Sequence, residues 1–230
     1  MGKSRLKRII AVLLIALVLP TIPLEHVYWS VGQYYYLRSK SAAYDENKED
    51  DAGLQGKDAG IITTGIKKIG DKKYYIKKGV IKRKLRSIVK VGKTYYVVDQ
   101  GVIKRRTSKR CNKILALQKK YPEGRKWTNR NKYLWKSHVQ GYGCAAFSFI
   151  ASDAAYGKKA KVVRHRKFGK VKSGDILRLD YDTHSVVVLE KLSKGVIVAE
   201  GNYNSTIHWF RYISMKNIRK TGIYVETRKK

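Results

Sequence analysis

The pattern of hydrophobic and polar positions in the second half of the chain predicts two helices followed by a run of strands. Ser108 is suited to cap the first helix, and the second runs for about three turns from Cys144 to a stop at Gly157. Four later segments are rich in β-branched residues and are separated by turn residues: 174–180, 184–192, 195–202 and 206–213. Helices followed by consecutive short strands indicate an α+β domain in which helices pack on an antiparallel sheet.

An internal repeat precedes this domain. Residues 65–82 are echoed by residues 87–104 at an offset of 21 to 22 positions, and residues 60–65 resemble part of a further unit. Each full unit has a short apolar strand, a glycine-containing turn, a second strand with paired tyrosines, and another glycine. Units of this size cannot bury an apolar face alone, so they must stack on a neighbour. Residues 60–106 are therefore predicted to form a small β-hairpin repeat module.

The N-terminus has the pattern of an export signal. Four basic residues precede an unbroken apolar run over residues 9–19: Lys3, Arg5, Lys7 and Arg8. The apolar stretch ends at Leu24 and is shorter than the roughly 20 residues of a typical membrane span. Residues 1–36 are thus a cleaved signal peptide or an uncleaved anchor, and both place the rest of the chain outside the membrane. Residues 37–59 are charged, lack apolar periodicity and are predicted to be a flexible linker.

Charge narrows the choice of partners. The 230 residues include 51 Lys and Arg against 17 Asp and Glu, for a formal net charge of +34. Such a field favours nucleic acid, anionic lipid or an anionic cell wall. Export argues against nucleic acid and leaves an anionic wall polymer as the expected partner. Two cysteines are too few for a disulfide framework or a cysteine-rich zinc site.

Cys144 is placed where nucleophilic chemistry would need a thiol. At a helix N-terminus the dipole and the unpaired N–H groups stabilise a thiolate. Gly141 and Gly143 let the backbone turn sharply and approach a substrate closely. The alternative is a buried structural cysteine, which is the interpretation favoured for Cys111 inside the preceding helix.

A thiolate nucleophile requires a base and a group that orients it. His184 opens a predicted strand, a position that is rigid yet reachable. In an antiparallel hairpin the end of the next strand returns beside His184, and this end carries Glu200 and Asn202. The two residues are two positions apart, so both side chains are expected on the same face.

Four stretches carry a family resemblance that covers roughly residues 108–230: GYGCAAFSF, SGDILRL, HSVVVLE and AEGNYNSTIHW. They resemble CHAP domains, which are papain-like cysteine hydrolases of bacterial envelopes, with NlpC-type hydrolases as relatives. The resemblance implies a papain-like fold over residues 107–230 and assigns the nucleophile to Cys144 and the base to His184. It assigns the third catalytic position to Glu200 and an additional polar position to Asn202, and it implies no metal and no organic cofactor.

Residues 60–106 resemble the cell-wall-binding repeats of Gram-positive surface proteins. Ile66 and Ile88 stand where many of those repeats carry tryptophan. Aromatic cages hold quaternary ammonium groups by cation–π attraction, so choline is not an expected ligand.

Together these features predict an exported, monomeric cysteine hydrolase that cleaves an amide bond in peptidoglycan, as an endopeptidase or an amidase. Two alternatives stay open. One is a non-catalytic cell-surface-binding protein that keeps a hydrolase-like fold, and the other is a secreted cysteine protease that acts on protein.

Overall fold

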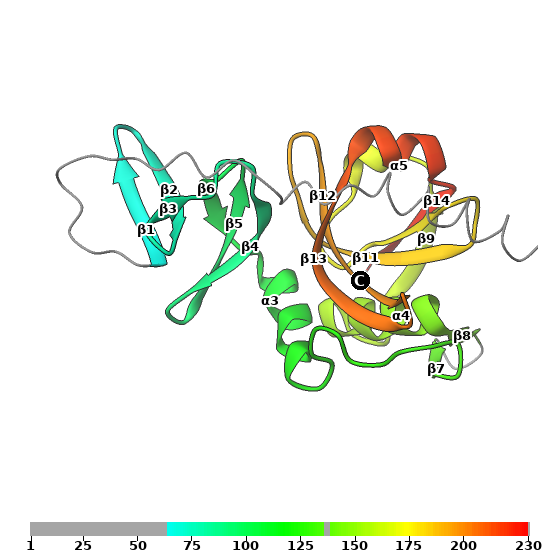
Figure 1. Ribbon diagram of the computed structural model, residues 1–230. Coiled ribbons are helices and arrows are strands. Elements are labelled where there is room, and N and C mark those ends of the chain that lie inside the picture. Colours follow the sequence, from blue (N-terminus) through cyan, green and yellow to red (C-terminus); the bar gives the residue numbers. More distant parts are fainter. Residues whose placement is uncertain (1–63, 136–138, 230) are drawn as a thin grey trace, which may run out of the picture. The chain divides into compact units, whose positions relative to one another are not determined.

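The computed structural model describes residues 64–135 and 139–229, all within one compact unit that spans residues 49–230 (Figure 1). It has three α-helices, and all its paired strands are antiparallel, which confirms the predicted mixed α+β class. The proposed export signal and linker, residues 1–36 and 37–59, lie outside the described residues. In the part of the chain that is described, no helix combines the length and hydropathy that crossing a membrane requires.

The repeat forms a six-stranded sheet. Its strands are β1 (Thr64–Ile69), β2 (Lys72–Lys77), β3 (Val80–Ile81), β4 (Arg86–Val91), β5 (Thr94–Asp99) and β6 (Val102–Arg106). Their order is β1-β2-β6-β5-β4, with β3 paired to β2. Each strand of the first unit recurs in the second, since β1 begins at Thr64 and β4 begins 22 residues later at Arg86. Gly70 and Gly92 adopt positive φ in the two hairpin turns, where a side chain would be strained.

The remaining chain contains the second sheet and the helices. Its helices are α3 (Lys109–Leu115), α4 (Gly143–Tyr156) and α5 (Met215–Thr221), with 3-10 turns at Ala116–Lys119 and Phe168–Lys170. Its strands are β7 (Lys132–Trp135), β8 (Val139–Tyr142), β9 (Lys161–His165), β10 (Ile176–Leu179), β11 (His184–Lys191), β12 (Gly195–Tyr203), β13 (Thr206–Ser214) and β14 (Tyr224–Lys229). The main sheet has the order β13-β12-β11-β10-β14-β9, and β7 pairs only with β8.

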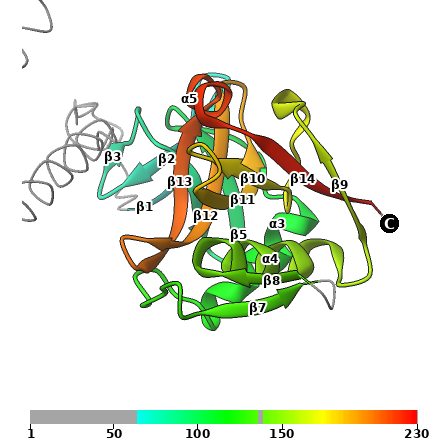
Figure 2. The same cartoon turned by 90° about the vertical axis from the view of Figure 1, so that its right-hand side faces the viewer.

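The two faces of the main sheet bury different cores. Helices α3 and α4 cover one face, where Phe147 of α4 packs in the same cluster as Leu189 of β11 and Ile197 of β12. The other face packs against α5, which contributes Ile218. Figures 1 and 2 both show α4 below the strands β11 and β12 and α5 above them.

The second repeat unit shares the core of the main sheet. Ile88 of β4 and Val97 of β5 are buried in the same cluster as Ile114 of α3. Arg105 donates to the buried carboxylate of Glu190 at 2.9 Å. The repeat module is therefore packed onto the following domain through apolar and ionic contacts.

Candidate active site

The thiol of Cys144 lies in the first turn of α4, and a tight loop fixes its position. Gly143 has φ +50°, and a Cβ atom there would lie 2.3 Å from Asn129 Oδ1, so only glycine fits. The indole Nε1 of Trp127 donates to the Gly143 carbonyl at 2.8 Å, a buried bond. The backbone before the nucleophile is thus held by glycine geometry and by a tryptophan anchor. The thiol itself faces the main sheet, with Sγ 3.9 Å from the Thr183 carbonyl.

His184 connects the thiol to a buried carboxylate. It is the first residue of β11, and its Nε2 lies 2.7 Å from Glu200 Oε2 on β12. The imidazole of His184 also interacts with the Cys144 thiol, and each group shifts the pKa of the other. The structure therefore brings three of the four predicted site residues together: Cys144, His184 and Glu200.

Arg211 of β13 binds the buried carboxylate of Glu200. The Glu200 side chain is fully buried, and the Arg211 guanidinium contacts both of its oxygens, with Nη2 2.6 Å from Oε2. A buried carboxylate requires this kind of compensation, because desolvation of an isolated charge is very costly. The Arg211 guanidinium also stacks 5.0 Å from the Tyr203 ring centre. Arg211 thus holds Glu200 ionised and aimed at the imidazole.

The electrostatic interactions among Cys144, His184 and Glu200 favour a thiolate–imidazolium pair. Burial opposes ionisation of Cys144, but the hydrogen bond and charge of His184, helped by the Ser185 N–H, lower its pKa below the ordinary 9.0. Burial likewise opposes a charged His184, yet Cys144 and Glu200 raise its pKa from 6.5 to about 9. Burial would raise the pKa of Glu200, but His184 and Arg211 lower it to about 2. At neutral pH His184 and Glu200 are therefore charged, and the lowered pKa of Cys144 favours the thiolate that nucleophilic attack needs.

Asn202 has different partners from Glu200, contrary to the expectation that the two side chains share a face. The pairing of β12 with β13 is irregular between Glu200 and Tyr203, and Asn202 has φ +59°. These two features break the two-residue alternation. The Asn202 side chain instead donates to Asn129 Oδ1 at 2.8 Å, against the backbone of Gly143. It lies beside the nucleophile loop and makes no hydrogen bond to His184.

Other thiol, carboxylate and imidazole groups of the domain have structural partners. Cys111 is fully buried in α3, and this burial, together with Glu190, raises its pKa well above the ordinary range. Asp175, in the Gly-Asp turn, is buried and accepts from the hydroxyls of Tyr156 and Thr227 at 2.7 Å. His208 pairs with Glu123 at 2.9 Å, away from Cys144. Their partners indicate roles in folding.

Sequence reasoning missed three residues that shape the site: Trp127, Asn129 and Arg211. Arg211 offered a signal, since it is the sole Lys, Arg, Asp or Glu in β13, a strand with five apolar or aromatic residues. Trp127 and Asn129 lie between the two predicted helices, in a stretch with no pattern of a regular element. No group of three or more His, Cys, Asp or Glu residues suited to a metal ion occurs in residues 64–135 and 139–229.

Comparisons with known proteins add no assignment, because no family model, no curated protein and no solved structure matches this chain.

Proposed function

We propose that this protein is an exported cysteine hydrolase of papain-like type that cleaves an amide bond in peptidoglycan. The observation that carries the proposal is the grouping of Cys144, His184 and Glu200, in which His184 bonds to the buried carboxylate and lowers the pKa of the thiol while its own pKa is raised. The pKa of Cys111, by contrast, is raised by burial and by Glu190. The order along the chain, with the nucleophile on a helix and the base on a later strand, agrees with the CHAP-like resemblance.

The reaction proceeds in two steps at Cys144. The thiolate attacks the amide carbonyl carbon and forms a C–S bond, and the backbone N–H groups at the start of α4 stabilise the oxyanion. The imidazolium of His184 gives its proton to the leaving nitrogen as the C–N bond breaks. Neutral His184 then takes a proton from water, which attacks the thioester and releases the carboxylic acid and the thiolate. Glu200 remains ionised throughout and stabilises the cationic imidazole.

Peptidoglycan is the proposed substrate because three separate features agree with it. These are the export pattern of residues 1–36, the net charge of +34, and the wall-binding-like repeats over residues 60–106. An anionic wall attracts a cationic enzyme and raises its local concentration.

The test uses the full-length protein and purified peptidoglycan, with released fragments identified by mass spectrometry. New amine and carboxyl ends are expected with the wild-type protein and absent with folded Cys144→Ala and His184→Ala variants. The mass of the fragments distinguishes a sugar–peptide amide from a bond within the peptide. Release of the same fragments by Cys144→Ala would refute the proposed nucleophile. If the wild-type protein released no peptidoglycan fragments but cleaved a protein, the proposed substrate would be protein and not peptidoglycan.

A further inference from the structure

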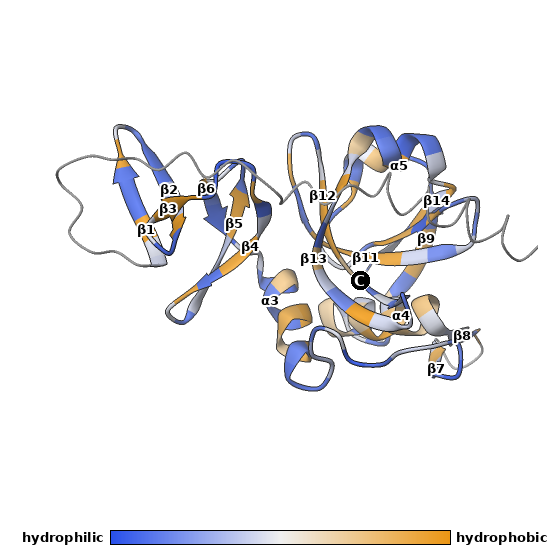
Figure 3. Cartoon of the chain, in the orientation of Figure 1, coloured by the Kyte–Doolittle hydropathy of each residue, from blue (hydrophilic) through white to orange (hydrophobic). Residues whose placement is uncertain are grey.

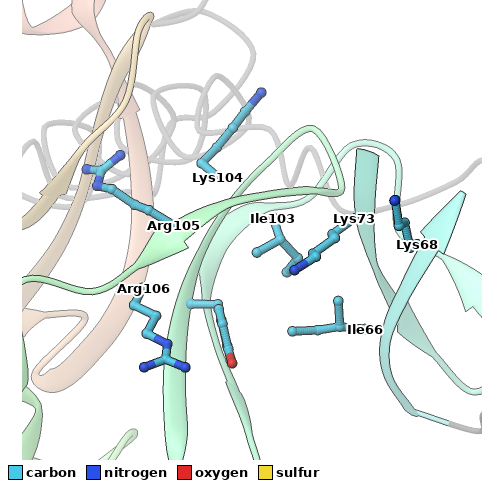
Figure 4. A pocket seen from close by; sticks show the side chains of 8 residues that line it. Ile66, Lys68, Lys73, Ile103, Lys104, Arg105 and Arg106 are labelled. Carbon is cyan, nitrogen blue, oxygen red and sulfur yellow. The ribbon is translucent and has the colours of Figure 1, made fainter. Parts of the chain in front are cut away.

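The repeat module contains a cavity of about 520 Å³ that the proposed chemistry does not use. Five cationic and three less polar residues line it: Lys68, Lys73, Lys104, Arg105, Arg106, Ile66, Tyr96 and Ile103. They come from β1, β2, β5 and β6, so both repeat units contribute to it. Figure 4 shows Ile103 and Lys73 projecting from different strands into the same space.

The lining has an apolar floor and a cationic rim. Ile66, Tyr96 and Ile103 are half-buried, whereas the five cationic side chains are exposed. No carboxylate lines the cavity. A concave site of this composition suits a ligand whose backbone has C–H groups and whose substituents carry negative charge.

Arg105 of the rim is neutralised by Glu190, but the three rim lysines have no such partner within the described part of the chain. Lys68 and Lys73 are direct cross-strand partners, an arrangement that repels and destabilises a hairpin. Residues 64–135 and 139–229 provide no ion pair for either lysine, nor for Lys104. Residues 64–106 hold fifteen Lys and Arg but only two acidic residues, and one of these, Asp99, pairs with Arg86. Figure 3 shows the resulting hydrophilic character of β1 and β2. A bound polyanion would relieve this repulsion.

A comparison of the two repeat units explains why Ile66 is available to line the cavity. Ile66 and Ile88 occupy equivalent positions, 22 residues apart. Ile88 is 3% exposed because the core of the following domain covers it. Ile66 is half-buried and forms the floor of the cavity instead. The same apolar position thus serves packing in one unit and is available to a ligand in the other.

We infer that this cavity binds an anionic polyol or sugar polymer, with Lys68, Lys73 and Lys104 contacting its charged groups and Ile66 and Ile103 contacting its carbon backbone. The negative charge can come from phosphodiesters or from carboxylates, since lysine recognises both as a point charge. Nucleic acid fits less well, because single-strand binding uses aromatic side chains as stacking platforms, and Tyr96 is the sole aromatic residue in the lining. This binding does not depend on the proposed hydrolysis.

The test measures binding of the full-length protein to fluorescent poly(glycerol phosphate) and, in a second arm, to polygalacturonate, over a range of salt concentrations. The variant is the triple substitution Lys68→Gln, Lys73→Gln, Lys104→Gln. Its matched control is Lys72→Gln, Lys77→Gln, Lys93→Gln, which removes the same charge from exposed residues of the module outside the cavity lining. Melting temperatures confirm that both variants fold.

The cavity variant is expected to bind at least one of the polymers about tenfold more weakly at 0.15 M salt, and the control less than about threefold more weakly. The slope of log affinity against log salt should fall by about 2 in the cavity variant, because each neutralised charge contributes about 0.7. The polymer whose affinity falls more in the cavity variant shows whether the site recognises phosphodiesters or carboxylates. Equal losses in both variants would overturn the cavity as the site, and tighter binding of oligothymidylate than of either polymer would overturn the ligand class.

Cleavage of a small soluble peptidoglycan fragment, measured on the same preparations, separates this inference from the proposed function. The cavity variant should cleave the fragment at the wild-type rate. Wild-type protein that binds the polymer but cleaves nothing would refute only the hydrolase, and wild-type protein that cleaves but binds neither polymer would refute only the cavity site.

Discussion

Glu200→Gln tests the electrostatic role of the buried carboxylate with almost no change in shape. The pKa of His184 is raised from 6.5 to about 9, which at 1.36 kcal/mol per unit corresponds to roughly 3 kcal/mol in favour of the imidazolium. Cys144 and Glu200 both contribute to this preference. Burial opposes the imidazolium, so these two partners together supply more than the net amount. The loss of the Glu200 charge is therefore expected to cost at least about 1.5 kcal/mol, or about tenfold in kcat/KM.

The assay is kcat/KM on a soluble peptidoglycan fragment as a function of pH. In the wild-type protein, activity should fall as pH rises through about 9, where His184 loses its proton. In Glu200→Gln this alkaline limb should move about one pH unit toward neutrality, because the imidazolium is less stable. Glu190→Gln is the control: Glu190 is also a buried carboxylate bound to an arginine, but its partners are Arg105 and the Ser108 N–H. An unchanged limb in Glu200→Gln, or equal shifts in both variants, would refute the reasoning.

The same variant has an effect on stability with a defined sign. The pKa of Glu200 is lower in the folded protein, about 2 against 4.5, so its stabilisation is fully present above about pH 4.5 and is lost as pH falls through about 2. Near neutrality the melting temperature of Glu200→Gln should be roughly 5 °C below wild type, since Arg211 is partly exposed and can be rehydrated. This difference should shrink as the pH is lowered toward 2.

Two further predictions concern the thiols and Asn202. Brief treatment with substoichiometric iodoacetamide near pH 6 should label Cys144, because its pKa is lowered. It should spare Cys111, which is fully buried and has a raised pKa. Peptide mapping measures both sites, and equally fast labelling of Cys111 would contradict the proposed site. Asn202→Ala should reduce kcat/KM less than Glu200→Gln and leave the alkaline limb in place, because its amide bonds to Asn129 and not to His184. A larger loss in Asn202→Ala would make the asparagine the third catalytic residue.

Local sequence patterns were sufficient to predict the helices and strands that carry the proposed catalytic residues. Ser108 caps α3 by accepting from the Cys111 N–H at 3.1 Å, as predicted, and α4 ends where Gly157 adopts positive φ. Strands β10 to β13 were visible because their buried residues are strongly β-branched. The missed elements, β7, β8, β9, β14 and α5, are short or carry many charged and polar residues, so their pairing depends on tertiary contacts that no local window contains.

The site was predictable to the extent that it follows from hairpin geometry. The pairing of β11 with β12 brings Glu200 to His184, as the spacing along the chain predicted. The different position of Asn202 results from an irregular strand pairing and a left-handed backbone conformation, neither of which has a reliable signature at a non-glycine residue. Arg211 reaches Glu200 from a third strand, a contact set by the register between β12 and β13.

The packing of the repeat module also decides how binding and catalysis can be separated by experiment. A simple modular organisation would allow residues 60–106 to be deleted without loss of cleavage. Ile88 and Val97 are almost fully buried in the core that also contains Phe147 of α4. Deletion would expose that core and remove the Arg105 partner of a buried carboxylate, a loss of several kcal/mol. An inactive deletion protein would therefore report unfolding. Substitution of exposed lysines around the cavity leaves the shared core intact, and such variants can therefore show whether the repeat module binds a polymer independently of the hydrolase.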